Sequence, residues 1–229
     1  TWATAVGYKA KAVTNGTALG NETYAAGSGT AVGHSASSAE SGFAGGNEAK
    51  AGASGVAIGA NANNAGNGVA IGQAASSATY ATAVGLTAKA VQNGTALGNE
   101  AKAQAEYTLA AGRQAVASSA QATALGNEAY AQGTNTVALG YKAVTTNNND
   151  IAIGNFTSAT GTAALAAGNR TIAGGASAIA LGDRAFTSSA NAIAMGTSTG
   201  ANGDNTIAIG TNAKANGEKS ISIGYANVV

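Results

Sequence analysis

The side chains that most often carry out chemistry are few in this sequence and lie far apart. Its only histidine is His34, and its three aspartates are Asp150, Asp183 and Asp204. A nucleophilic triad needs a base held beside a nucleophile, and His34 follows Gly33 in a predicted turn, where a histidine is usually solvated. The absence of cysteine excludes disulfides and cysteine-ligated metals. We therefore predict no enzyme, no cofactor and no metal site.

Two stretches resemble ion-binding loops at first sight. The segment "AGGASA" at 173–178 lacks the aspartate that calcium-binding β-rolls carry in every turn. The segment "NNND" at 147–150 offers oxygen ligands, but an asparagine-rich return loop explains it more simply. Glycine-rich phosphate loops require a strand followed by a helix, a context that this sequence does not provide.

Basic and aromatic residues on predicted outward positions are the candidate contacts for a protein ligand, because Tyr and Arg dominate the energetics of many interfaces. The alternative, that they only shield the sheet, stays open. The candidate ligand-binding residues are Lys9, Lys11, Tyr24, Lys50, Lys89, Lys102, Tyr130 and Arg170.

The composition excludes several classes of protein. The 229 residues include 34 Gly and no Pro, only 9% are charged, and the formal net charge is +1. Nucleic-acid binding requires a basic surface, so a nucleic-acid partner is not expected. No run of eighteen apolar residues and no signal-peptide pattern is present, so we expect no direct membrane insertion and no export signal in this sequence.

The elements that must position these residues follow from a repeat that runs through the chain. A tetrapeptide of the type [T/V/I/L]-A-[V/I/L]-G closes each repeat with glycine, and "NGTALGNE" occurs at both 15–22 and 93–100. The period is thirteen residues up to about residue 98 and fourteen residues from about 99 to 224. The closing glycines are residues 7, 20, 33, 46, 59, 72, 85, 98, 112, 126, 140, 154, 168, 182, 196, 210 and 224.

Each repeat predicts two short strands and two turns. Residues alternate with period two before the glycine, as in "VAIG" at 56–59, and again after it, as in "EAKA" at 48–51. A glycine in every repeat and this spacing argue against a helix. We therefore predict an all-β parallel solenoid over a single repeat domain, residues 1–229, with the extra fourteenth residue in the return loop.

The alternation also predicts which side chains face inward. We place the bulky first and third letters of the tetrapeptide inside the coil, facing the two Ala of the second strand, so that the second letter points outward. Inverted parity, with the bulky pair outward, stays open. Because an uninterrupted apolar stripe implies a contact with other chains, the predicted interface between copies comprises Ala57, Ala70, Ala96, Ala124, Ala138, Ala152, Ala180 and Ala208.

The array of "VAIG" at 56–59 and 69–72, "NTVALG" at 135–140 and "NTIAIG" at 205–210 resembles the head repeats of the YadA-like trimeric autotransporter adhesins of Gram-negative bacteria. The resemblance implies a left-handed parallel β-roll and a homotrimer. It also implies an extracellular position on the bacterial outer membrane, at the tip of a surface fibre that binds host matrix proteins or cell-surface receptors.

The sequence departs from the family pattern in a few places. The irregular tetrapeptides "FAGG" at 43–46 and "LAAG" at 109–112 and 165–168 predict local under-packing of the core. The family's neck, coiled-coil stalk and membrane barrel are not found in the sequence, so we expect a head fragment.

Three other functions compete with adhesion. An ice-binding solenoid needs a regular Thr array, yet Thr at the first tetrapeptide position gives way to Val, Ile or Leu in the second half. A purely structural solenoid is the simplest alternative and stays open. An acyltransferase of the hexapeptide type would need coils of eighteen residues, which the period excludes.

Overall fold

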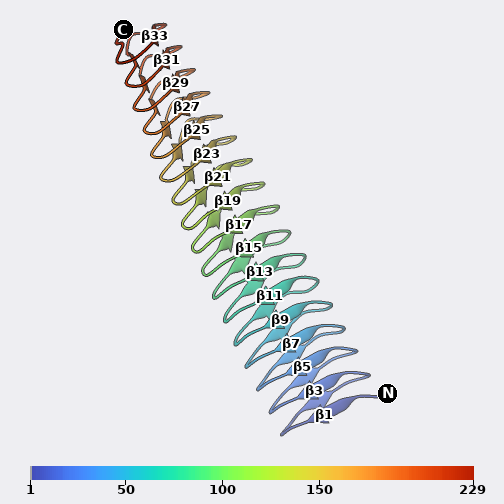
Figure 1. Ribbon diagram of the computed structural model, residues 1–229. Coiled ribbons are helices and arrows are strands. Elements are labelled where there is room, and N and C mark those ends of the chain that lie inside the picture. The colour runs from blue at the N-terminus through green and yellow to red at the C-terminus, as the bar shows by residue number, and fades with distance from the viewer. Residues whose placement is uncertain (1) are drawn as a thin grey trace. The chain divides into compact units, whose positions relative to one another are not determined.

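The computed structural model describes residues 2–229, and within that range every regular element is a β-strand. The chain forms two compact units, and the boundary between them lies after Gln114, close to the change of period. In each unit the coil repeats along the chain (Figure 1). Among residues 2–229 there is no helix long and apolar enough to cross a membrane.

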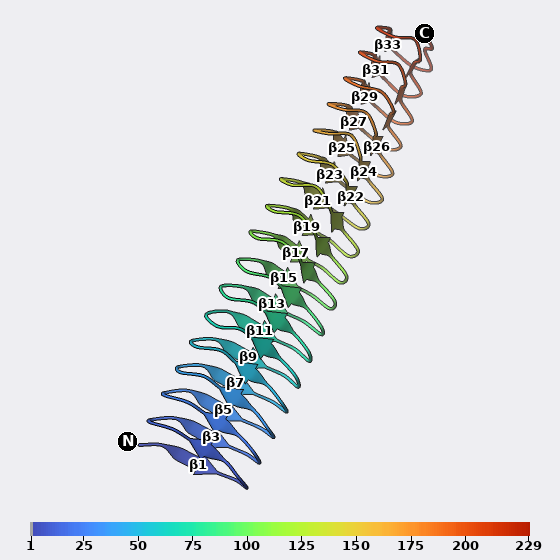
Figure 2. The ribbon, with the colours of Figure 1, turned by 180° about the vertical axis from the view of Figure 1, so that it is seen from behind.

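Each coil contributes a three-residue strand and a two-residue strand, numbered odd and even respectively. Figure 2 shows β22, β24 and β26 on the side of their coils opposite the odd strands. Unit 1 contains the odd strands β1 (Thr4–Val6), β3 (Thr17–Leu19), β5 (Thr30–Val32), β7 (Phe43–Gly45), β9 (Val56–Ile58), β11 (Val69–Ile71), β13 (Thr82–Val84), β15 (Thr95–Leu97) and β17 (Leu109–Ala111). Its even strands are β2 (Lys11–Ala12), β4 (Tyr24–Ala25), β6 (Ser37–Ser38), β8 (Lys50–Ala51), β10 (Asn63–Asn64), β12 (Ser76–Ser77), β14 (Lys89–Ala90) and β16 (Lys102–Ala103).

Unit 2 continues the same alternation. Its odd strands are β19 (Thr123–Leu125), β21 (Val137–Leu139), β23 (Ile151–Ile153), β25 (Leu165–Ala167), β27 (Ile179–Leu181), β29 (Ile193–Met195), β31 (Ile207–Ile209) and β33 (Ile221–Ile223). Its even strands are β18 (Val116–Ala117), β20 (Tyr130–Ala131), β22 (Val144–Thr145), β24 (Ser158–Ala159), β26 (Ile172–Ala173), β28 (Phe186–Thr187), β30 (Gly200–Ala201) and β32 (Lys214–Ala215).

Within each unit the strands of one kind pair in parallel with the same position of the next coil. Val56 of β9 lies opposite Val69 of β11 in a thirteen-residue step, and Val137 of β21 lies opposite Ile151 of β23 in a fourteen-residue step. The predicted all-β parallel solenoid is therefore confirmed. The register also confirms that the extra residue lies in the return turn, because both kinds of strand keep their lengths when the period changes. The single-domain organisation stays a prediction.

The glycine that closes each tetrapeptide forms the bend between the two strands. All seventeen have φ between 118° and 142°, a conformation that L-residues with a side chain rarely adopt. A Cβ on Gly98 would lie 2.6 Å from the carbonyl oxygen of Gly112, the same position of the next coil. Glycine is required here both by its φ and by the close approach of successive coils.

The residue two positions after each glycine is left-handed as well, and it usually carries a side chain. At this position φ lies between 51° and 59°, and the residues include Glu48, Thr87, Phe156 and Arg170. The left-handed conformation costs a non-glycine residue about 1–2 kcal/mol. In every coil the turn therefore holds a strained residue whose side chain lies at the edge of the two sheets.

The interior of the coil is made of small side chains, and our assignment of the first strand's faces is wrong. The second letter of the tetrapeptide points inward, and the Ala assigned to an outward interface are fully buried within the chain itself. Ala57, Ala70, Ala96, Ala124, Ala138, Ala152, Ala180 and Ala208 are all 0% exposed. The inward orientation of the second strand's Ala is confirmed, as at Ala49 and Ala51.

The error has a physical cause. We placed the bulky residues inside because Val, Ile and Leu are usually the most buried residues. A coil of thirteen or fourteen residues closes with two tight turns, and its two sheets approach so closely that the inward positions of the strands hold only small side chains, mostly Ala with some Ser and Thr and one Asn, Asn64. The small residues in "FAGG" and "LAAG" therefore leave the core intact. They instead reduce the apolar side-chain area on the outer face of the odd strands. At Gly45 the freed space is taken by the Phe43 ring, whose nearest atom would lie 3.1 Å from an added Cβ.

Candidate binding surfaces

In each unit the outer face of the odd strands carries a row of mostly apolar side chains, with threonine at some of the first positions. This odd-sheet stripe comprises the first and third residues of every odd strand, such as Val56 and Ile58 in β9. Twelve of the seventeen third residues are more than one-third exposed, with Ile58 at 40% and Leu125 at 43%, whereas Gly45, Val84, Ala111, Ala167 and Leu181 are partly buried. An apolar surface that runs through successive coils is larger than a soluble monomer usually exposes.

The outer face of the even strands differs between the two units. Its outward positions, the first residue of each even strand, form the even-sheet ladder. In unit 1 the ladder reads Lys11, Tyr24, Ser37, Lys50, Asn63, Ser76, Lys89 and Lys102. In unit 2 it reads Val116, Tyr130, Val144, Ser158, Ile172, Phe186, Gly200 and Lys214. The first surface is basic and polar, whereas the second is largely apolar.

Most of the predicted ligand-binding residues lie on this ladder. Lys11 pairs with Tyr24 in register, and its ammonium lies 5.7 Å from the centroid of that ring. Lys89 and Lys102 also occupy neighbouring coils of unit 1. Lys50 stands apart from them on the same ladder.

The other three predicted ligand-binding residues lie outside the unit 1 part of the ladder. Tyr130 occupies the ladder of unit 2. Lys9 lies in the first turn of unit 1, 5.0 Å from the Tyr8 ring centroid and 3.8 Å from Glu22. Arg170 lies in a turn of unit 2. The eight residues are therefore not brought together into one site.

The turns of unit 2 form a cluster of aromatic and cationic side chains that we define as the turn cluster: Tyr141, Lys142, Phe156, Arg170 and Arg184. The Tyr141 and Phe156 rings meet edge to face with centroids 5.0 Å apart. The Lys142 ammonium lies 5.3 Å from the first ring centroid and 5.8 Å from the second. The Arg170 guanidinium lies 5.8 Å from the Phe156 centroid. Cations over aromatic faces are attracted by the ring quadrupole.

Lys142 is further held by a carboxylate. Its Nζ lies 3.4 Å from Glu128, on the preceding coil. The Tyr141 side chain first, and the Glu128 carboxylate second, raise the pKa of the Lys142 ammonium above its ordinary value. Lys142 is thus a charged and oriented part of the cluster at neutral pH.

Of these five residues, only Arg170 is among the predicted ligand-binding residues. The signal that we missed is positional: Lys142, Phe156, Arg170 and Arg184 all stand two residues after a closing glycine, at fourteen-residue intervals. Side chains at equal repeat positions stack on neighbouring coils. Reading each repeat position down the chain would have placed these four side chains in one row.

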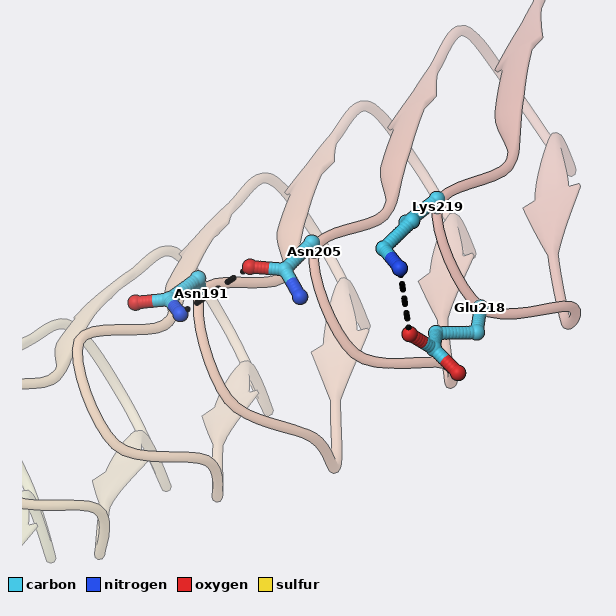
Figure 3. Close-up of polar contacts among 4 residues, drawn as sticks. All are labelled: Asn191, Asn205, Glu218 and Lys219. Atoms are coloured by element: carbon cyan, nitrogen blue, oxygen red, sulfur yellow. Dashed lines mark hydrogen bonds and ion pairs between the residues drawn. The ribbon is translucent and has the colours of Figure 1, made fainter.

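The return turns at the opposite edge of unit 2 carry rows of amides. The Asn191 amide nitrogen donates to the side-chain oxygen of Asn205 on the next coil, at 3.1 Å, and Figure 3 shows this bond. Glu218 and Lys219 form an ion pair of 3.0 Å in the last of these return turns (Figure 3). The Asn191–Asn205 bond joins two successive coils, whereas the Glu218–Lys219 pair lies within one turn.

The titratable residues considered at the outset are dispersed, as expected. His34 is exposed, and its Nδ1 lies 3.2 Å from the side-chain oxygen of Asn47. Asp150 is fully buried, and its carboxylate accepts hydrogen bonds from the amides of Asn147 at 2.8 Å and Ala164 at 3.0 Å. Burial raises the pKa of Asp150 above its ordinary value.

Neither a pocket nor a metal-binding group is found within residues 2–229. No cavity is enclosed there, and no three His, Asp or Glu side chains lie close enough to hold a metal ion.

A comparison with curated proteins finds no match to the chain. A scan against protein families matches the YadA head domain repeat at residues 92–113, 103–129, 131–157, 173–199 and 201–227, which together cover more than half of the chain. All of these segments lie in the part of the sequence where the fourteen-residue period operates or begins. Since the repeat, the parallel coil and the family match agree, the chain belongs to the YadA-like head domains of the trimeric autotransporter adhesins.

Proposed function

We propose that this chain is the head of a bacterial surface adhesin, which forms a homotrimer through the odd-sheet stripe and attaches the cell to host matrix proteins or host cells. The observation that carries the proposal is the stripe itself. Its bulky residues are too exposed for a lone chain, and a parallel arrangement of three copies gives each stripe two neighbours. Membership of an adhesin family supports the extracellular location.

The inverted parity changes which residues form the proposed interface. The contact between copies is made by the first and third residues of the odd strands, such as Leu139 and Ile153, in place of the buried Ala. The even-sheet ladder and the turns then remain available to ligands. Repetition along the coils lets many weak contacts act together, which raises avidity.

The oligomeric state is the first test. Light scattering of the chain is expected to give three times the chain mass of 21.6 kDa at micromolar concentration. A charge in the stripe, Ile153→Lys, is expected to dissociate the trimer, because three like charges would be desolvated together. The matched control is Ser158→Lys, on the outer face of the even strand of the same coil. A monomer at that concentration would refute the proposed trimer.

Attachment is tested separately. Trimeric chain is applied to surfaces coated with matrix proteins and to cultured host cells, alongside the Ile153→Lys variant. Binding by the trimer and much weaker binding by the variant is the expected result, because avidity falls with the number of copies. A trimer that binds none of these surfaces would refute the adhesin function and favour a purely structural solenoid.

The ice-binding alternative has less support. Thr at the first odd-strand position forms a run of only three coils, Thr4, Thr17 and Thr30, before Phe43 and Val56 interrupt it. A second run at Thr82 and Thr95 ends at Leu109. A flat array long enough to order water is therefore missing from the described coils.

A further inference from the structure

We propose that the turn cluster of unit 2 binds a sulfated polysaccharide, with Arg170 and Arg184 holding its anionic groups and Phe156 packing against its sugar rings. This inference rests on the proposed adhesin function and names one class of host ligand for it. The cluster is distinct from the odd-sheet stripe, since its side chains stand in the turns that follow the closing glycines.

The two arginines provide the anion-binding groups. Both are exposed, and among residues 2–229 neither makes an ion pair with a carboxylate. Asp183, the acidic residue next to Arg184, instead accepts a hydrogen bond from the Asn169 amide at 2.7 Å. A guanidinium presents planar, paired N–H donors that suit the oxygens of sulfate and carboxylate groups. Two such groups are therefore available on consecutive coils.

The spacing of the cations favours an extended ligand. Successive coils rise by about 4.8 Å, so Arg170 and Arg184 are one step apart and Lys142 lies two steps before Arg170. Phe156 occupies the step between Lys142 and Arg170, with 43% of its surface exposed. A row of cations interrupted by an exposed ring matches a linear polymer that alternates charged groups with apolar ring faces.

The backbone argues against an acidic peptide as the ligand. A peptide that adds as a strand needs unpaired backbone groups. In the turn cluster the amides are already bonded to the preceding coil: Phe156 donates to Tyr141 at 2.9 Å, Arg170 to Asn155 at 2.8 Å and Arg184 to Asn169 at 2.9 Å. Recognition must then come from side chains.

Lys142 is a positioning residue in this arrangement. Its ammonium forms an ion pair with the Glu128 carboxylate and lies near both rings. It thereby holds the Tyr141 and Phe156 rings at the surface beside Arg170.

The test measures binding of the trimeric chain to immobilised heparin, a sulfated polysaccharide, at about 0.15 M salt. The double variant Arg170→Ala with Arg184→Ala is expected to weaken binding at least about tenfold, since two charge-assisted contacts are lost. Phe156→Ala, which leaves the net charge unchanged, is expected to weaken binding by about threefold. Poly-glutamate and unsulfated hyaluronan are expected to bind much more weakly than heparin.

The charge-matched control is Lys214→Ala with Lys219→Ala. It also removes two cations from unit 2, in its last coil and outside the turn cluster. An equal loss of heparin binding in this control would overturn the proposal, since it would indicate a general charge effect. Poly-glutamate binding as tightly as heparin would overturn it as well.

Light scattering of each variant separates this inference from the proposed function. The arginine double variant is expected to stay trimeric, and its dissociation would mean that the cluster belongs to the interface between copies. A trimer that attaches to matrix or cells but not to heparin would refute the sulfated ligand and leave the adhesin function standing. A trimer that attaches to none of these surfaces would refute both.

Discussion

Thirteen-residue and fourteen-residue coils contain the same two kinds of strand, and their return turns differ in length by one residue. The difference is clearest at the residue just before each odd strand, which we call the pre-strand position. In six of the seven return turns that join thirteen-residue coils it is glycine, at Gly16, Gly29, Gly42, Gly55, Gly68 and Gly94, with Ala81 the exception. In the fourteen-residue coils it carries a side chain, at Thr108, Ala122, Thr136, Asp150, Ala164, Ala178, Ala192, Thr206 and Ser220.

The room available at the pre-strand position explains this difference between the two coil types. A Cβ on Gly29 would lie 2.3 Å from the carbonyl oxygen of Ala39 in the next coil. One more residue in the turn makes room for a side chain at this position, and where that side chain is threonine its hydroxyl bonds to the turn itself. Thr136 Oγ1 donates to the carbonyl of Gly133 at 2.7 Å, and Thr206 Oγ1 to that of Gly203 at 2.7 Å. The length of the turn thus decides what the interior can hold.

The largest effect is expected when the threonine typical of the pre-strand position in fourteen-residue coils is placed in a thirteen-residue coil. Gly29→Thr is expected to destabilise its coil by about 3 kcal/mol or more, because the new side chain would overlap backbone atoms that cannot withdraw. Hydrogen exchange of the amides in β3, β5 and β7 measures the local opening free energy.

Two further variants sharpen this test. Ser28→Thr, a change of an exposed residue in the same turn, is expected to leave the exchange rates nearly unchanged. One serine inserted after Ala26 in the Gly29→Thr chain is expected to restore part of the lost protection, since it lengthens the turn. Unaltered protection in Gly29→Thr alone would show that space is not the limiting factor.

The reverse change in a long coil is expected to cost less. Thr136→Gly removes a buried methyl group and a hydroxyl that bonds to Gly133, which together are worth about 1–2 kcal/mol. Local exchange in β19, β21 and β23 measures the loss. Thr136→Ser keeps the hydroxyl and is the control, with a smaller loss expected. A loss in Thr136→Gly as large as that in Gly29→Thr would remove the distinction between the two coil types.

The turn after the closing glycine is common to both coil types and offers a smaller, stabilising change. Thr87 has a φ of 52°, which is unfavourable for a β-branched residue. Thr87→Gly is expected to raise the free energy of unfolding by about 0.5–1 kcal/mol. Asn212→Gly, at the equivalent position of unit 2, is expected to change it little, because asparagine tolerates this conformation. Thermal unfolding that gives equal shifts for both variants would contradict the strain argument.

The smallest effect is expected in how the melting temperature depends on pH. Burial raises the pKa of Asp150 in the folded chain above its unfolded value of 3.8. The fold therefore favours the protonated form, and this group's contribution is fully present below pH 3.8 and lost as the pH rises through the folded pKa. Asp150→Thr places at this position the residue type found at Thr136 and Thr206. This variant is expected to abolish the fall in melting temperature that the buried carboxylate causes as the pH rises.

The matched control for Asp150 is Asp204→Thr, which removes an exposed carboxylate from a return turn of the same unit. The difference in melting temperature between variant and parent is followed from acidic to neutral pH. A parent and an Asp150→Thr variant with identical pH dependence would contradict the role of the buried carboxylate.

The repeat made the strands, their parallel register and the closing glycines predictable, because each depends on local patterns that recur at a fixed spacing. Val56–Ile58 and Lys50–Ala51 were recognisable from alternation alone. The face of the first strand was not, because in "VAIG" both parities are apolar and only the narrow space inside the coil selects Ala57. The turn cluster was missed for a related reason: Tyr141 and Phe156 are fifteen residues apart in the sequence, and neighbours only once coils stack.

The mostly alanine interior has a consequence for how such a chain changes in length. A coil whose inward residues closely match those of its neighbours can be duplicated or deleted whole, since the adjoining coils meet similar small side chains and the same ladder either way. In-frame recombination between near-identical stretches, such as "NGTALGNE" at 15–22 and 93–100, would then yield folded heads of different reach from one gene. Bacteria that carry heads of this kind could adjust how far the tip stands from the cell without designing a new fold.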